Sequence, residues 1–366
     1  MRTAFLILVS LHGLIHLLGF VKGVGLSAVS ALSLPISKPV GLLWLISTLL
    51  FLLYAFLQFG HHKYAWLIGF MALLLSQILI ILVWKDAKWG TLPNVLILLV
   101  SIVSFGSYHF QKKVEAETAH LLNQSNTVEE RIVTEQDISA LPDPVKKWLG
   151  ASGMIGKPYI RLGKLSQEAE MKMKPDQKNW LNAKALQYST IDKPAFIWST
   201  RVSMNPLLFF LGRDKFEEGQ GDMLIKLNAL FPVVNEQGEK IDEGALQRYL
   251  GEMVWFPSLA LSPYITWEPI DTASAKASME YKGTQGSGTF YFNSEGDFVK
   301  FSAQRFMGNE QGAKRHEWVL LVDAYKTFEG IRVPAEMTAT WKLEAGDWTW
   351  LKLKLVDVKY NENTSR

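Results

Sequence analysis

Residues 39–60 read PVGLLWLISTLLFLLYAFLQFG and contain no acidic or basic side chain. A helix needs roughly 20 apolar residues to cross the hydrocarbon core of a bilayer. Three further runs of the same character flank this one, with short polar breaks between them: Ala4–Val21, Tyr64–Trp84 and Thr91–Phe110. The sequence therefore predicts four transmembrane helices within the first 110 residues, as in a multi-pass membrane protein.

Charge divides the chain at the same place. Residues 1–110 carry six Lys and Arg and one Asp, a net charge of +5, whereas residues 111–366 carry the other 32 basic and 34 acidic residues, a net charge of −2. The C-terminal part thus lacks the basic surface of a nucleic-acid-binding protein. The positive loops between the runs suit the anionic headgroups of a bilayer. We therefore expect the lipid bilayer as a partner and no nucleic acid.

Two sequence features leave the compartment open. With four spans, four basic residues border each side of the membrane, which is a tie under the positive-inside rule. The chain contains no cysteine, which excludes disulfides, thiolate catalysis and cysteine-type zinc sites on either side of a membrane. The side on which the C-terminal part lies is therefore undecided.

The C-terminal part alternates apolar and polar residues, a pattern typical of half-buried strands. Ala169, Met171 and Met173 alternate with charged residues, and similar stretches recur to residue 358 with short turns between them. Consecutive strands joined by short turns predict an antiparallel sheet. We expect an α+β domain at 138–366, preceded by a transmembrane domain at 1–112 and a helical linker at 113–137.

One helix is expected among these strands. Asp242 is a good N-cap, Leu246, Leu250 and Met253 follow at helical spacing, and Pro257 ends the segment. A meander of strands with one apolar helix predicts a curved sheet, or half-barrel, wrapped over that helix.

Polar residues inside the first and third runs are candidates for function, because such residues are costly in a membrane. His12 and His16 lie four apart on one helix face, and Gln77 lies in the third run. Three roles fit the histidines: hydrogen bonding to another helix through Gln77 or Asn94, proton or quinone-type chemistry, or metal ligation. The remaining histidines do not match their depth, so we predict no metal and no cofactor.

The segment Arg248–Pro257 is the densest in polar and aromatic side chains. Arg248 and Glu252 are four apart and can pair on one helix face. Facing a cavity, they would hold a ligand head group or act as acid and base; facing solvent, they would form a surface ion pair. Trp255 and Phe256 end the helix and are candidates for lining the same cavity.

A second apolar segment, residues 205–212, lies between two strand patterns. It contains Leu207, Phe209 and Phe210. Two placements fit it: a short buried helix, or an apolar lip at the mouth of a ligand cavity or against the bilayer.

No catalytic motif stands out. His316 is available for a serine-type triad, but Gly286-Ser287-Gly288 lacks the spacing of a nucleophile elbow. Gly219-Gln220-Gly221 opens a strand and not a helix, which disfavours phosphate binding.

Several blocks together resemble an uncharacterised, bacterial, membrane-associated family. They are Leu141-Pro142-x-Pro144-Val145 with Trp148-Leu149 and Gly153, Phe196-x-Trp198, Gly219-x-Gly221-x-Met223, the helix from Asp242 to Pro257, Trp267-x-x-Ile270-Asp271, and Tyr325 with Gly330 and Val333-Pro334. The resemblance implies a domain without assigned activity, in the bacterial cytoplasmic membrane. The layout is also similar to LolA-type lipoprotein carriers, which implies a half-barrel that binds acyl chains.

The favoured function is non-enzymatic binding of a lipid or another apolar ligand at the membrane surface. One alternative is an enzyme for a membrane or envelope substrate, with Glu252, Asp271 and Arg305 as its groups. Another is an interaction or signalling module for a membrane-protein partner. An enzyme predicts carboxylates converging inside a cavity, a binder predicts an apolar cavity with polar groups only at its rim, and a partner module predicts an exposed apolar patch without a cavity.

Overall fold

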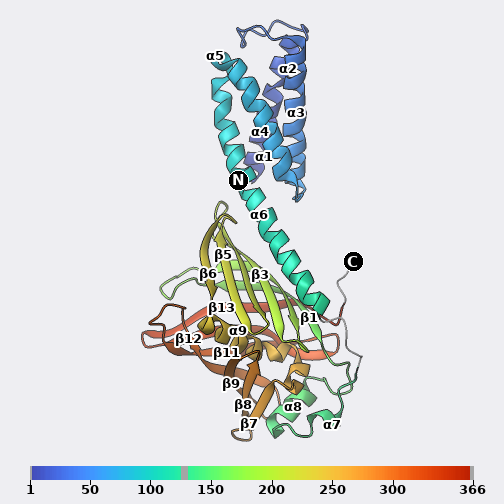
Figure 1. The fold of residues 1–366 in the computed structure, drawn as a ribbon, viewed down its shortest axis with the longest axis vertical. Helices are drawn as coiled ribbons and strands as arrows, with labels where there is room; N and C mark the ends of the chain where they lie inside the picture. The colour runs from blue at the N-terminus through green and yellow to red at the C-terminus, as the bar shows by residue number, and fades with distance from the viewer. Residues whose placement is uncertain (1, 125–130, 363–366) are drawn as a thin grey trace. The chain divides into compact units, whose positions relative to one another are not determined.

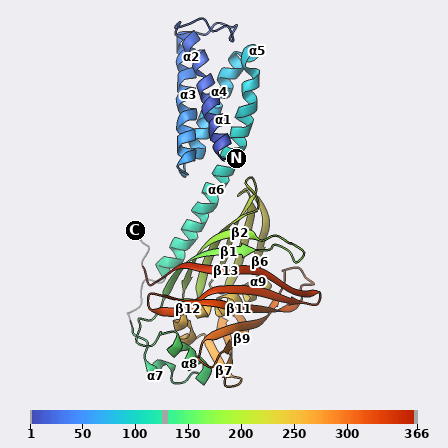
Figure 2. The same cartoon turned by 180° about the vertical axis from the view of Figure 1, so that it is seen from behind.

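A computed structural model describes residues 2–124 and 131–362 of the chain (Figures 1 and 2). The described residues divide into two compact units. The helical unit contains the residues up to Lys112 together with Asn228–Leu230. The sheet unit contains Lys113–Leu227 and the residues from Phe231 onwards.

The helical unit consists of apolar helices joined by short segments. Its elements are α1 (Arg2–Ile15), α2 (Leu17–Gly23), α3 (Lys38–Phe59), α4 (Ala65–Leu82), α5 (Trp84–Ala87), a short 3₁₀ helix (Lys88–Gly90) and α6 (Thr91–Gln124). In the described part of the chain, four helical stretches are long and apolar enough to cross a membrane: 2–23, 38–59, 65–82 and 84–124. This confirms the four long apolar helices predicted from the sequence.

The first of these stretches is interrupted at His16, between α1 and α2. The His16 ring nitrogen Nδ1 lies 2.8 Å from the carbonyl oxygen of His12. The His16 amide instead donates to the Gly13 carbonyl, at 3.1 Å. The imidazole therefore takes the place of a backbone donor, and the helix tightens locally to a three-residue turn.

Small residues let α2 and α3 approach closely. A side chain at Gly19 would meet the ring of Trp44, and one at Gly23 would meet the backbone of Gly41. Close backbone approach at small residues is a common means of packing helices in membranes. Gly19 and Gly23 therefore lie where α2 meets α3.

In the sheet unit, the described residues form a thirteen-stranded antiparallel sheet. The strands are β1 (Leu162–Met171), β2 (Leu181–Thr190), β3 (Ala195–Ser203), β4 (Phe209–Glu217), β5 (Gln220–Leu227), β6 (Phe231–Gln237), β7 (Ile265–Pro269), β8 (Ser274–Tyr281), β9 (Thr284–Phe292), β10 (Phe298–Phe306), β11 (Arg315–Phe328), β12 (Ile331–Leu343) and β13 (Gly346–Tyr360). Their order is β6-β5-β4-β3-β2-β1-β13-β12-β11-β10-β9-β8-β7. Two meanders are therefore joined side by side through β1 and β13, and β6 and β7 are the edges.

The segment between the two edge strands fills the curl of the sheet. It contains α9 (Glu239–Gly251) and two 3₁₀ helices, Glu252–Trp255 and Pro257–Leu261. Helix α9 contacts β4 and β5 of one meander and β8, β9 and β10 of the other. Figures 1 and 2 show the sheet curling around α9. The expected half-barrel wrapped over a helix is therefore confirmed.

The start of α9 differs from the expectation. The helix begins at Glu239, after Gly238 with φ +110°, and not at Asp242. The Asp242 carboxylate instead accepts a hydrogen bond from the amide of Gly221 in β5, at 2.7 Å. Asp242 therefore ties the first turn of α9 to the sheet and does not cap it. A glycine in the left-handed region can end the preceding strand without steric cost.

The apolar run at residues 205–212 is not a short helix. It forms a turn followed by the first residues of β4, which pair with β3 from Phe209↔Ser203 onwards. The alternation of side chains in this segment suits a strand and not a helix. Phe210, Gly212 and Asp214 lie on one face of the strand, and Phe209 and Leu211 lie on the other face.

Before the first strand, two short helices close one end of the sheet unit. They are α7 (Glu135–Ile138), which starts with a capping box between Thr134 and Asp137, and α8 (Asp143–Ala151). Helix α8 buries Val145, Trp148 and Leu149 in the main core.

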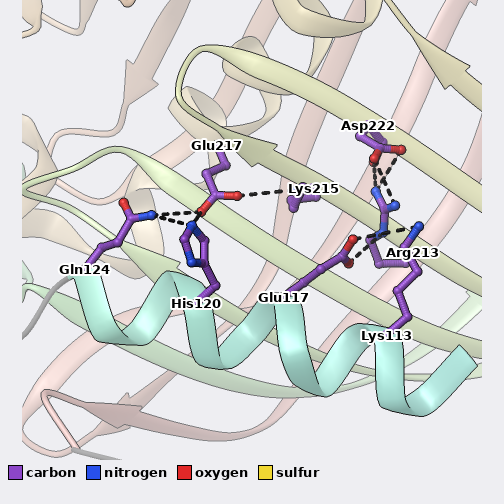
Figure 3. Close-up of polar contacts among 8 residues, drawn as sticks. All are labelled: Lys113, Glu117, His120, Gln124, Arg213, Lys215, Glu217 and Asp222. Atoms are coloured by element: carbon purple, nitrogen blue, oxygen red, sulfur yellow. Dashed lines mark hydrogen bonds and ion pairs between the residues drawn. The ribbon is translucent and has the colours of Figure 1, made fainter. Parts of the chain in front are cut away.

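The last turns of α6 lie on the outer face of the sheet (Figure 3). Leu121 is buried against Ala195 and Ile197 of β3. Arg213 of β4 is only 1% exposed; its Nε lies 3.1 Å from Glu117 Oε2, and its Nη1 lies 2.9 Å from Asp222 Oδ1. Burial raises the pKa of the Asp222 carboxyl, but hydrogen bonds and charge from Arg213 outweigh it and bring that pKa below its ordinary value.

We propose a domain boundary between Lys112 and Lys113. The expected linker at 113–137 is then divided. Residues 113–124 belong with the sheet, 125–130 lie outside the described residues, and 135–138 form α7.

A fragment of residues 113–366 should fold with a strong β signal in circular dichroism. A fragment of residues 131–366 should be less stable by about 1.5–3 kcal/mol in urea titration, the worth of burying one leucine. Equal stabilities would show that the end of α6 contributes nothing to the sheet unit.

Candidate functional site

A cavity of about 300 Å³ lies inside the curl of the sheet. Its wall contains six tryptophans: Trp198, Trp255, Trp318, Trp341, Trp348 and Trp350. Strand register brings three of them together, because Trp341 pairs with Trp318 of β11 on one side and with Trp348 of β13 on the other. Aliphatic residues such as Met337, Ala339 and Leu353 complete much of the wall. The cavity surface is therefore mostly apolar.

Arg248 of α9 holds a cluster of buried polar groups at the wall of this cavity. Its Nε lies 2.7 Å from Glu252 Oε1, and its Nη1 lies 2.6 Å from Asp214 Oδ2. Its Nη2 donates to Gln187 Oε1 at 3.1 Å, and Gln187 Nε2 in turn donates to Glu252 Oε2 at 2.7 Å. We call Asp214, Arg248, Glu252 and Gln187 the charge cluster.

Aromatic rings cover the Arg248 guanidinium, whose central carbon lies 4.8 Å from the Phe196 ring centre and 5.0 Å from that of Trp198. Burial lowers the pKa of Arg248, but the charges and hydrogen bonds of Glu252 and Asp214 outweigh burial and raise it above its ordinary value. The cluster is thus a buried ion-pair network, with two carboxylates around one guanidinium, and not the surface ion pair that was the alternative.

Arg305 of β10 is a second cation at the cavity. Its guanidinium carbon lies 4.3 Å from the ring centre of Trp318 and 5.7 Å from that of Trp341. Its Nη2 donates to the Gly244 carbonyl of α9 at 2.8 Å. Burial lowers the pKa of Arg305 to about 10, an effect that the charge of Asp214 partly opposes.

The structure brings four of the seven candidate ligand-binding residues to this cavity: Phe210, Arg248, Glu252 and Trp255. The other three lie elsewhere. Leu207 is 69% exposed in the turn before β4. Phe209 lies under the guanidinium of Arg201, whose central carbon is 3.6 Å from the centre of the Phe209 ring. Phe256 is buried against Gly163 and Tyr360 in the core.

Of the groups considered for an enzyme, Asp271 is remote from this site. It lies in the turn between β7 and β8, where its carboxylate accepts from the Ala273 amide at 2.8 Å. That hydrogen bond is the first cause of the lowered pKa of Asp271. Among the described residues, no group of three or more His, Asp or Glu side chains is arranged to hold a metal ion.

Sequence reasoning missed Asp214, Gln187 and the tryptophans of β11–β13. Asp214 could have been predicted, because in the pattern Phe210-x-Gly212-x-Asp214-x-Phe216 it is a charged residue on the otherwise apolar face of a strand. The tryptophans of β11–β13 lie on consecutive strands, but their meeting depends on the register of those strands, which alternation alone does not fix.

The polar residues of the helical unit form a separate network. His12 Nε2 lies 2.9 Å from Asn94 Oδ1, and His16 Nε2 lies 2.9 Å from Ser76 Oγ. Asn94 Nδ2 donates to Gln77 Oε1 at 3.0 Å. Of the three roles considered for the histidines, this geometry matches hydrogen bonding to another helix. His12 contacts Asn94 directly, and Gln77 is linked to His12 through Asn94.

The crystal structure of a LolA superfamily protein from Nitrosomonas europaea is similar over 60% of this chain and 94% of that chain, with 10% identity and a TM-score of 0.32. The half-barrel described above rests on the strand order of this chain and not on that likeness. No curated protein gives a significant match.

A family model described as a family of unknown function matches residues 131–353. That range contains every cavity-lining residue named above and excludes His12, His16 and Gln77. The match covers more than half of the chain, and the protein therefore belongs to this family, DUF6544.

Proposed function

We propose that the sheet unit binds a lipid or another apolar molecule in the tryptophan-lined cavity, without catalysing a reaction. The observation that carries this proposal is a mostly apolar cavity of about 300 Å³ within an otherwise well-packed core. Protein interiors are close-packed, and an empty cavity lowers stability in proportion to its volume. A ligand with apolar surface would restore those contacts, and pockets of about 300–1,000 Å³ are usual for small ligands.

We place this binding at a membrane surface. The four helices long and apolar enough to cross a membrane support this placement, and the residue blocks similar to a bacterial family support the bacterial cytoplasmic membrane. Helix α6 continues from an apolar segment into residues that pack on the sheet, so the binding unit follows the last span without a break in the helix.

The three functional alternatives predicted different sites. A partner module predicted no cavity, and the cavity disfavours it. An enzyme predicted converging carboxylates, and Asp214 and Glu252 do converge on Arg248. This observation keeps an enzyme as the second candidate, but both carboxylates are held by Arg248, which suits a structural role better than proton transfer. The binder predicted polar groups only at the rim, and here they lie in a buried cluster.

Filling the cavity tests the proposal. Ala339 is 1% exposed and lines the cavity, so Ala339→Phe should occupy ligand space. Val356→Phe is the control, because Val356 is 48% exposed on β13. Lipids extracted from equal amounts of the purified full chain should include a compound class present in the wild type and in Val356→Phe and depleted in Ala339→Phe by mass spectrometry.

Lipids bound around the apolar helices should be equal in all three samples and provide the internal reference. Circular dichroism should show that both variants keep their β signal, because overpacking costs about 1–3 kcal/mol. Identical extracts from three folded proteins would contradict ligand binding in the cavity.

A further inference from the structure

Hydrogen-bond donors without partners surround the cavity. Four buried N–H groups of lining residues have neither a hydrogen-bond acceptor nor an ion-pair partner in the described part of the chain: Nε of Arg305 and Nε1 of Trp318, Trp348 and Trp350. A fifth, Arg213 Nε, lies 3.1 Å from Glu117 Oε2. Only one buried acceptor of the lining, Asp214 Oδ1, lacks a donor among the same residues. An indole nitrogen can only donate, so the wall offers donors in excess.

Two other indoles of the lining have acceptors. Trp198 Nε1 donates to Gln167 Oε1 at 2.8 Å, and Trp255 Nε1 donates to the Pro334 carbonyl at 3.0 Å. Buried polar groups are nearly always paired, and each exception calls for an explanation. Trp318, at 3% exposure, is such an exception in the same wall.

The four charges around Arg248 and Arg305 are balanced: Asp214 and Glu252 are negative, and the two arginines are positive. Two further cations belong to the lining. Arg213 is paired with Glu117 and Asp222, and the half-buried Lys172 has its amino group over the ring of Trp180, outside the lining. An anionic ligand would add a charge without a counter-ion in a buried site, which is strongly unfavourable. A neutral acceptor oxygen would satisfy a donor and keep the balance.

We propose that the ligand of this cavity is a neutral molecule with a hydrocarbon chain and a carbonyl-type acceptor, such as an acyl ester, received by Arg305 and Trp318. This inference rests on the proposed function and narrows the class of ligand. The Arg305 guanidinium lies over the ring of Trp318, so the two unpaired donors belong to side chains in direct contact. At about 300 Å³ the cavity is at the small end of ligand pockets and suits one chain.

Competition between three compounds with ten-carbon chains tests the inference on the full chain in nanodiscs. The probe is methyl decanoate with a diazirine on its chain, and the readout is photolabelling of peptides that line the cavity. The competitors are decane, methyl decanoate and, at pH 8, ionised decanoate. The ester should compete better than decane, and decanoate should compete at least about 10-fold less well than the ester, because burying an unpaired charge costs more than one hydrogen bond.

Variants remove the donors one at a time, and comparison with the wild type cancels differences in partition into lipid. Trp318→Phe keeps the ring and should reduce the ester preference over decane by about 2–10-fold, the worth of one neutral hydrogen bond. Arg305→Met should reduce it by about 10–100-fold, since the lost donor is charged. Trp180→Phe is the control; Trp180 lies between Lys172 and Lys352, and it does not line the cavity.

The outcomes separate the two proposals. Absence of label on the cavity peptides in the wild type would overturn the proposed function itself. Label in the cavity with the same ester preference in the wild type, Trp318→Phe and Arg305→Met would overturn the acceptor role alone. Decanoate competing as well as the ester would overturn neutrality. If Arg305→Met does not fold, Trp318→Phe still decides, because it changes no charge.

Discussion

Replacing Arg248 with methionine is expected to lower the free energy of unfolding of the sheet unit by about 3–5 kcal/mol, the usual cost of removing one partner of a buried ion pair. Asp214 and Glu252 are each 7% exposed and both pair with Arg248. Without the guanidinium, two carboxylates would remain buried with Gln187 as the nearest donor to Glu252. Methionine preserves most of the packing against Phe196 and Trp198, so the loss reports on charge.

Urea titration of the full chain, followed by circular dichroism of the β signal, measures this change. The matched control is the triple variant Asp214→Asn, Arg248→Met and Glu252→Gln, which removes all three charges and should recover most of the lost stability. If the triple variant is as unstable as Arg248→Met, lost packing and not buried charge is responsible.

The same variant should have a distinctive pH dependence. A buried carboxyl that has lost a hydrogen-bonded cation takes up a proton more readily than the same group in the unfolded chain, so the loss of the cation raises the pKa of such a group in the folded state. Stability from a raised pKa is present at low pH and is lost as the pH rises through the folded pKa. Arg248→Met should therefore lose less stability at pH 5 than at pH 8, whereas an unchanged deficit would argue against buried, ionised carboxylates.

Replacing Leu250 with alanine is expected to cost about 2–5 kcal/mol, through lost burial and the cavity left behind. Leu250 is fully buried in α9, at the centre of the curled sheet. Its neighbour Gly251 contacts Phe301 and Leu320, so sheet residues surround this part of the helix and leave little room to collapse.

Leu207→Ala is the control for this second prediction. Leu207 is 69% exposed in the turn before β4, so its truncation should change stability by no more than about 0.5 kcal/mol. A loss below 1 kcal/mol for Leu250→Ala in urea titration would contradict the placement of α9 inside the sheet. A large loss for Leu207→Ala would contradict the exposed turn.

Much of this fold was predictable from sequence because its signals are local. The uncharged runs around residues 39–60 decide the four apolar helices, and period-two alternation decides the strands. The Arg248–Glu252 pair follows from helical spacing alone, and it forms at 2.7 Å. The burial of that pair was not predictable, because its other partners, Asp214 of β4 and Gln187 of β2, are distant in sequence and no local pattern connects them to α9.

Two local predictions failed for physical reasons. Asp242 has the chemistry of an N-cap, but a tertiary hydrogen bond to Gly221 outweighs that role. Residues 205–212 are apolar enough for a buried helix, yet pairing with β3 makes their second half a strand. That choice also separated two candidate site residues, because adjacent residues in a strand face opposite sides, and only Phe210 lines the cavity.

The most direct test of the account is to locate a bound apolar molecule on the full chain. Photolabelling in nanodiscs with diazirine-bearing methyl decanoate, followed by peptide mapping, gives that location. We predict label on cavity residues such as Met337, Trp341 and Leu353, with loss of this label in Ala339→Phe and its retention in Val356→Phe. Label confined to the apolar helices and the outer face of the sheet, unchanged by Ala339→Phe, would contradict a ligand-binding cavity.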